Sequence, residues 1–99
     1  MAAKSLHNEK TDILFDVILS LKTREECYEF FEDLCTVKEL CSMVQRYDVA
    51  RMLDQGKTFS LISEETGAST ATIARVNKCL QYGEGYSKAL MREKEQGSN

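Results

Sequence analysis

Hydrophobic residues recur every three or four positions over most of the chain, the spacing that places side chains on one face of an α-helix. Between Asp12 and Lys22 they cover most of the helix circumference. The residues concerned are Ile13, Leu14, Phe15, Val17, Ile18, Leu19 and Leu21. A surface helix of a small protein normally carries a narrower apolar stripe. We therefore expect this helix to be covered from two sides, and in so short a chain a second subunit is the economical source of the second cover.

Two capping signals predict where the next two helices begin. Thr23 precedes Glu26, and Thr36 precedes Glu39, by the three residues of a capping box. The first box starts a helix with a complete apolar stripe, formed by Cys27, Phe30, Phe31, Leu34 and Cys35. The opposite side is acidic, with six carboxylates against two basic residues over residues 24–39. We interpret it as a solvated face, because nothing nearby would raise the pKa of one carboxyl for catalysis.

The second box starts a long central helix that we expect to end at about Asp54, close to Gly56. In its first half one face carries Val37, Leu40, Cys41, Val44 and Tyr47. Asp48 and Arg51 then interrupt this face. The apolar residues of the second half, Val49, Ala50 and Leu53, lie elsewhere on the cylinder. The two ends of this helix are therefore expected to contact different partners, which makes it a scaffold between the first helices and the segment that follows.

The stretch from Thr58 to Leu80 is the segment whose residue order predicts a specific supersecondary shape. Phe59 and Ile62 give a first helix an apolar face, which stops at Gly67. A glycine directly after the last periodic residue supplies the left-handed conformation that ends a helix. A second helix then starts, and two helices joined by so short a turn form a helix-turn-helix.

The second helix of this pair starts at Ser69 or Thr70, since either hydroxyl can accept a backbone N–H of the first turn. Its apolar residues are Ile73, Val76 and Leu80, which face back toward the first helix. The outward positions are small at the front and basic behind, as in a helix that enters the major groove of DNA by its N-terminal turn. We expect Ser69, Thr70, Ala71 and Ala74 to meet base edges, Arg75 and Lys78 to meet phosphates, and Ser60 and Ser63 to meet the DNA backbone beside the first helix. The same arrangement also occurs as pure packing in all-helical proteins, so that alternative stays open.

Composition supports a single all-α domain. The chain has 99 residues, no proline, five glycines and 42% hydrophobic residues. Its net charge of −3 argues against promiscuous nucleic-acid binding, although residues 66–82 contain two basic side chains and no acid. We expect N-terminal helices over about 10–35, a central helix over about 37–54, the helix-turn-helix over about 58–80 and a C-terminal helix over about 86–95.

Candidate chemistry beyond DNA contact is sparse in this sequence. The four cysteines contain no C-x-x-C pair, and the one histidine is His7, so no metal site is predicted. No nucleophile stands beside a base and no glycine-rich phosphate loop occurs, so we do not expect an enzyme. Neither a signal peptide nor an apolar run long enough to cross a bilayer is found, and we expect a cytoplasmic protein without a membrane partner.

A family resemblance rests on the segment from about Leu40 to Leu80, above all on D-Q-G-K and on E-T-G-A-S-T-A-T-I-A-R-V-N-K-C-L. These motifs resemble the tryptophan repressor family, and most closely its YerC/YecD branch. The resemblance implies a six-helix fold and an intertwined homodimer in which the N-terminal helices of two chains interlock. It also implies two helices that enter successive major grooves about 34 Å apart on a near-palindromic site.

The resemblance bears on a ligand as well. In tryptophan-binding members two arginines hold the ligand, and the matching positions here are Arg46 and Arg75. Val76 stands where those members have a glycine that leaves room for the indole ring, and Cys79 stands where they have a serine. A valine there would overpack the pocket at about 1 to 3 kcal/mol. We therefore expect no tryptophan corepressor, with Val76 filling the pocket and Arg75 serving either the DNA backbone or a carboxylate such as Asp48.

The leading hypothesis is a homodimeric, sequence-specific DNA-binding transcriptional regulator that represses expression. The alternative is a protein-interaction module that kept the helix-turn-helix as a scaffold and does not bind DNA. The acidic second helix and the negative net charge favour this alternative.

Overall fold

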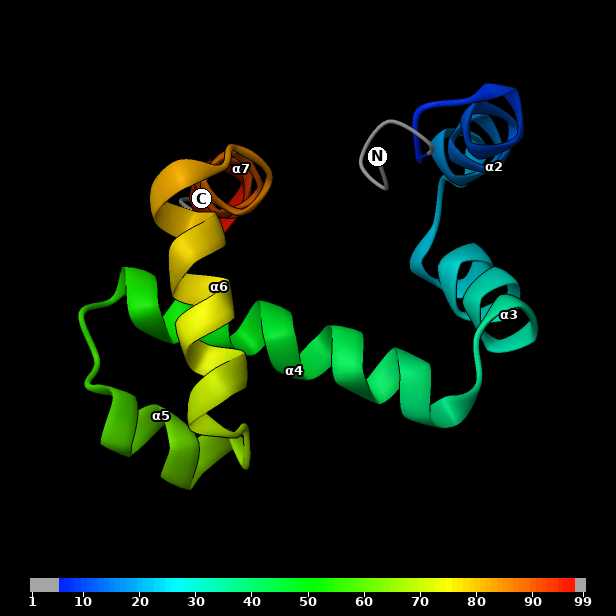
Figure 1. Ribbon diagram of the computed structural model, residues 1–99. Coiled ribbons are helices and arrows are strands. Elements are labelled where there is room, and N and C mark those ends of the chain that lie inside the picture. The colour runs from blue at the N-terminus through cyan, green and yellow to red at the C-terminus, as the bar shows by residue number, and fades with distance from the viewer. Residues whose placement is uncertain (1–5, 98–99) are drawn as a thin grey trace. The chain divides into compact units, whose positions relative to one another are not determined.

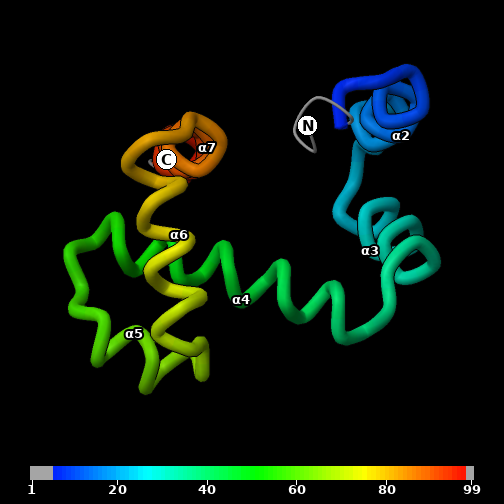
Figure 2. Tube along the Cα trace, in the orientation of Figure 1, coloured from blue at the N-terminus to red at the C-terminus, as the bar shows by residue number. Residues whose placement is uncertain are grey.

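The computed structural model describes residues 6–97, which form six α-helices, labelled α2 to α7, and no strand (Figures 1 and 2). The helices are α2 (Glu9–Ser20), α3 (Arg24–Leu34), α4 (Val37–Asp54), α5 (Phe59–Thr66), α6 (Thr70–Tyr82) and α7 (Gly85–Gly97). The expected all-α class is confirmed. The chain divides into two compact units, one up to Leu40 and one from Cys41 onward.

In the N-terminal unit, helix α2 starts three residues earlier than the sequence pattern predicted. Asn8 is its N-cap and accepts a hydrogen bond from the backbone N–H of Thr11 at 2.9 Å. The helix also ends earlier than expected, at Ser20, because the backbone of Leu21 is extended. The asparagine cap explains the earlier start, since asparagine ranks with the best N-cap residues.

Both predicted capping boxes are present. Thr23 accepts from the backbone N–H of Glu26 at 3.1 Å, and the Glu26 carboxylate accepts from the N–H of Thr23 at 3.2 Å. Thr36 and Glu39 repeat this exchange at 3.0 and 2.8 Å. These bonds satisfy donors that the first turn of a helix otherwise leaves unpaired. They fix the starts of α3 and α4 as the sequence predicted.

No residue of α2 or α3 is buried within the single chain. Leu19 is 81% exposed, and the apolar stripe of α3 is only partly covered, since Phe30, Phe31 and Cys35 are half-buried while Cys27 and Leu34 are exposed. The rings of Phe30 and Phe31 meet edge to face, with centroids 5.5 Å apart. The N-terminal unit therefore carries apolar surface that its own residues leave uncovered.

Helix α4 changes its apolar face along its length, as predicted. At the front, Val37 and Val44 are 81% and 63% exposed, whereas Val49 and Ala50 are 0% exposed. The helix ends with Gly56 in a left-handed conformation (φ 82°). The N–H of Gly56 donates to Leu53 O and that of Lys57 donates to Met52 O, each at 3.0 Å, in the pattern of a Schellman motif.

The C-terminal unit is built around one core. It consists of Val49, Ala50, Met52, Ile62, Ala68, Ile73, Val76 and Leu90. The four C-terminal helices contribute to it, and Figure 1 shows α6 running across α4 with α7 following at the end of α6. Helix α7 spans Gly85–Gly97, which is one residue earlier and two residues later than the predicted helix over residues 86–95.

The predicted helix-turn-helix is present as α5, a three-residue turn and α6. Gly67 has φ 75° and ends α5, which confirms its role as the hinge of the turn. Ser69, rather than Thr70, is the N-cap of α6. Phe59 was expected to face the core but is 38% exposed. It is the first residue of α5 and lies at the solvent-exposed N-terminal end of that helix. Leu61 packs against the core instead.

We expect Gly67→Ala to destabilise the protein by about 1 to 2 kcal/mol, because a Cβ is disfavoured in the left-handed region. The control is Gly85→Ala, at the first residue of α7. Gly85 has no positive φ, and a Cβ added there would meet no atom within 4 Å. Urea unfolding of the three proteins measures the difference. An equal effect of the two substitutions would contradict the assigned backbone strain.

Candidate nucleic-acid interface

The outward face of α6 lies open to solvent at its N-terminal end. Thr70, Ala71 and Ala74 are exposed, while Ile73 and Val76, on the opposite side of the same helix, are 0% and 1% exposed. The helical period separates the two sets, so burial of one set presents the other to solvent. The structure therefore places these three sequence-predicted residues together on one accessible surface.

The turn before α6 is held by side-chain hydrogen bonds. Ser63 Oγ donates to the carbonyl of Ala68 at 3.0 Å, and the N–H of Ala68 donates to Thr66 Oγ1 at 3.1 Å. Thr66 Oγ1 in turn donates to Ile62 O at 2.7 Å. Polar groups of a sharp turn that would otherwise lack partners are thus paired. This hydrogen-bonded turn fixes the start of α6 relative to α5.

Two of the sequence-predicted contact residues are engaged in this local structure. Ser63 uses its one hydroxyl hydrogen for Ala68 O, so donating to a phosphate would require that this bond open. Ser69 accepts from the N–H of Thr72 at 3.1 Å and shares a hydrogen bond with the Thr72 hydroxyl at 3.1 Å. Ser60 is exposed. The role of Ser63 in the turn was not predicted, because its hydrogen-bond partner, Ala68, lies beyond Gly67.

The cationic residues of α6 point to solvent. Arg75 and Lys78 are both exposed, and neither forms an ion pair with any residue in the range 6–97. Asp48, which the sequence suggested as a partner for Arg75, pairs with Arg51 at 3.5 Å. Since their charges are not neutralised by neighbouring carboxylates, both cations are available to an anionic partner.

The two arginines matched to ligand-holding positions differ in their surroundings. Arg46 is half-buried on α4, whereas Arg75 is exposed on α6. Val76 occupies the core at 1% exposure, and Cys79 is half-buried. Among the described residues no group of three or more His, Cys, Asp or Glu side chains is arranged to hold a metal ion.

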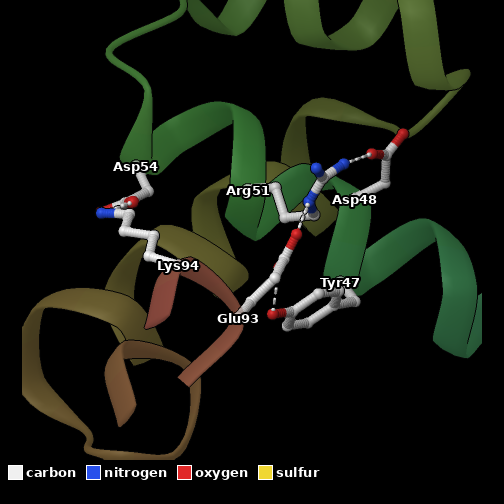
Figure 3. A network of polar contacts seen from close by, with 6 residues as sticks. All are labelled: Tyr47, Asp48, Arg51, Asp54, Glu93 and Lys94. Atoms are coloured by element: carbon white, nitrogen blue, oxygen red, sulfur yellow. Dashed lines mark hydrogen bonds and ion pairs between the residues drawn. The ribbon is translucent and has the colours of Figure 1, made fainter. Parts of the chain in front are cut away.

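A polar network joins α4 to α7 (Figure 3). The Tyr47 hydroxyl donates to Glu93 Oε1 at 2.7 Å, and Arg51 Nε donates to Glu93 Oε2 at 2.9 Å. The hydrogen bond from Tyr47, followed by that from Arg51, holds the pKa of the Glu93 carboxyl below its ordinary value. Burial, followed by the Glu93 carboxylate, raises the pKa of Tyr47. The network was not predicted, because residues 46 positions apart carry no joint signal in one sequence.

A pocket of about 310 Å³ lies beside this network. It is lined by Arg51, Asp54, Gln55, Leu90, Glu93, Lys94 and Gly97. Its charged residues are paired with one another: Arg51 with Glu93 at 2.9 Å, and Lys94 with Asp54 at 2.7 Å. The pocket therefore presents compensated charges, and these ion pairs fasten α7 to the end of α4.

A second helix that begins after a glycine-hinged turn, with small exposed residues at its front and unpaired cations behind, defines a protein of the helix-turn-helix class. Within residues 6–97, no helix has the length and the apolar character needed to span a membrane.

The chain belongs to the Trp repressor family, since the family model described as Trp repressor protein matches residues 9–95. It is 55% identical over 96 residues to the uncharacterized protein YerC of Bacillus subtilis (strain 168). The aligned region covers 96% of this chain and 92% of YerC. This confirms the resemblance to the YerC-type branch.

Two crystal structures resemble the chain closely. A TrpR-like protein from Eubacterium eligens ATCC 27750 has a TM-score of 0.87 and 49% identity, and the match covers 90% of this chain and 93% of that one. A candidate Trp repressor from Staphylococcus aureus has a TM-score of 0.89 and 50% identity, with 95% of each chain covered. The Trp-repressor-like fold predicted from the sequence is therefore confirmed.

We expect Tyr47→Phe to reduce the stability that depends on ionised Glu93. Because the folded-state pKa of Glu93 is lowered, its contribution is present above the unfolded-state pKa and is lost as the pH falls through the folded-state pKa. The stability difference between wild type and Tyr47→Phe should therefore shrink between about pH 5 and pH 3. Urea unfolding across this range measures it.

The matched control is Tyr86→Phe, at a half-buried tyrosine of the same core with no hydroxyl hydrogen bond to the described residues. Its difference from wild type should not change over the same pH range. Parallel curves for all three proteins would rule out the Tyr47–Glu93 bond as a source of pH dependence.

Proposed function

We propose that the protein is a homodimeric transcriptional regulator that binds specific DNA sequences and represses expression. The observation that carries this proposal is the exposed N-terminal face of α6, held by the hydrogen-bonded turn and flanked by unpaired cations. Membership of the Trp repressor family supports it, because the fold is that of a DNA-binding regulator.

In this proposal some residues of α6 contact base edges and others contact phosphates. Thr70, Ala71 and Ala74 lie at base edges, where short side chains allow the helix to approach the floor of the major groove. Arg75 and Lys78 contact phosphates and set the register. With so few cations, affinity for unrelated sequences is low and the dependence of binding on salt is shallow.

A second copy of this chain covers the exposed apolar residues of the N-terminal unit. Besides Leu19, the large side chains concerned include Ile13, Phe15, Val17 and Leu34, which are 40% to 57% exposed. Exposed apolar surface of this extent is typical of an interaction site in soluble proteins. A second subunit that repeats the same face would bury it on both chains, and would present two copies of α6.

This regulator works without bound tryptophan. Val76 is buried in the core at 1% exposure, so the space that a glycine would leave at this position is filled by the valine side chain. Because Val76 fills this space, we expect DNA binding to depend on another signal or on the concentration of the protein alone. A binding selection with and without added tryptophan should then recover the same sequences.

The alternative function is a protein-interaction module, favoured by the exposed carboxylates of α3 and the net charge of −3. The two functions differ in what a pull-down recovers. One stoichiometric protein partner that survives nuclease treatment, together with no consensus from random duplexes, would select the interaction module.

For the regulator, a selection from random duplexes should recover a consensus of two related half-sites. Arg75→Ala should then weaken binding about equally for related and unrelated duplexes and lower the salt slope by about 1 for each lost phosphate contact. Fluorescence anisotropy over a range of salt concentrations measures both effects.

Arg92→Ala is the matched control for charge, because Arg92 is an exposed arginine on α7. Both substitutions change the net charge by the same amount. Equal effects on binding would mean that Arg75 acts only through the overall charge, and would contradict its assigned phosphate contact.

We expect Leu19→Glu to dissociate the dimer. Leu19 is 81% exposed in the single chain, so the substitution leaves the chain's own packing intact, whereas burying it in a dimer contributes about 1.5 to 3 kcal/mol per subunit. Tyr82→Glu, at an equally exposed residue of α6, is the control and should leave the dimer intact. Sedimentation velocity reports the assembly state. A wild-type protein that sediments as a monomer would refute the proposed dimer.

A further inference from the structure

One side chain ties α4 to the helix-turn-helix by a polar contact. Gln45 Nε2 donates a hydrogen bond to the backbone carbonyl of Thr66 at 3.0 Å, across 21 residues of sequence. Among residues 6–97 it is the one hydrogen bond or ion pair from an α4 side chain to α5, α6 or the turn between them.

The acceptor of this bond belongs to the end of α5. Thr66 is the last residue of that helix, and the last carbonyls of a helix have no partner within it. The Gln45 amide also passes close to Gly67, since a Cβ built at Gly67 would lie 4.0 Å from Gln45 Nε2. Gln45 therefore rests on the turn that immediately precedes α6.

The position of Gln45 on α4 gives this bond its importance. Val49 is one turn further along the same face and is 0% exposed in the core, whereas Met43 and Val44, directly before Gln45, are 40% and 63% exposed. Gln45 thus lies between the exposed apolar residues of the front half of α4 and the buried residues of its second half.

Apolar packing and a hydrogen bond constrain helices differently. Burial of apolar area is non-directional, so it does not by itself specify which atoms of two helices must meet. A hydrogen bond needs a donor and acceptor within a narrow range of distance and angle. The Gln45 bond therefore fixes one point of the turn along α4, in addition to the packing of the core.

We infer that Gln45 is a positioning residue for DNA recognition, which sets where α6 starts relative to the exposed front half of α4, where Val37 and Val44 would meet the second subunit. The inference rests on the proposed function. In a dimer with two copies of α6, this one bond per subunit controls the separation and relative rotation of the two helices. Its effect on DNA binding is therefore selectivity for the spacing between half-sites, since one added base pair shifts a half-site by about 3.4 Å and rotates it by about 36°.

The test uses Gln45→Met, which keeps the length of the side chain and removes the donor. DNA affinity is measured by anisotropy on the selected duplex and on duplexes with one base pair inserted or removed between the half-sites. Wild type should discriminate among the three spacings, and the variant should lose about three- to tenfold of that discrimination. Affinity for a duplex with a single half-site, the salt slope and the sedimentation coefficient should stay unchanged.

Gln55→Met is the matched control, because Gln55 is an exposed glutamine directly after the end of α4. It should keep the wild-type spacing preference. If Gln45→Met folds poorly, Gln45→Ala, which cannot overpack the site, replaces it in the same measurement.

The outcomes separate the inference from the function on which it rests. Failure of wild type to select any consensus would refute DNA binding, and the inference with it. A wild-type consensus combined with an unchanged spacing preference in Gln45→Met or Gln45→Ala would refute the positioning role alone. Equal losses on all three spacings and on the single half-site would also refute it, since they would indicate a merely structural role.

Discussion

The packing of α6 in the C-terminal unit depends on a chain reversal of three residues, Gly67 to Ser69, between two helices. Gly67 takes a left-handed conformation at φ 75°, and Ser69 caps the next helix. Only with this reversal do Ile62 on α5 and Ile73 on α6 enter one core with α4. Because the reversal occupies so few residues, the turn carbonyls and N–H groups need side-chain partners, which the serine and threonine residues around the glycine supply.

The two units of the chain differ in how completely they bury apolar side chains. The C-terminal unit closes a core from its own helices, with side chains such as Val49 and Val76 fully removed from water. The N-terminal unit has well-capped helices but buries no residue of α2 or α3. Capping fixes helix ends, whereas stability of a folded unit comes mainly from tertiary packing. The ends of the N-terminal helices are therefore specified locally by sequence, although these helices bury no residue within the single chain.

Local signals explain which features could be predicted from the sequence. The boxes at Thr23 and Thr36 act within four residues, and Gly67 acts on its own backbone, so each was predicted correctly. The face change of α4 followed from periodicity alone. The bond from Gln45 to Thr66 and the Tyr47–Glu93 pair could not be predicted, because a single sequence does not show which distant residues meet. The cap at Asn8 is also a local signal but was not predicted, because polar residues separate it from Ile13, the first apolar residue of the helix pattern.

The exposed alanines of α6 have a consequence for how proteins of this type diverge. Ala71 and Ala74 contribute nothing to the core and make no side-chain hydrogen bond, so other residues can replace them without disturbing the helix. Alanine is also the best helix former, and most substitutes cost only a few tenths of a kcal/mol, up to about 0.7 kcal/mol, at an exposed position. Related chains can therefore change these two positions and keep one scaffold.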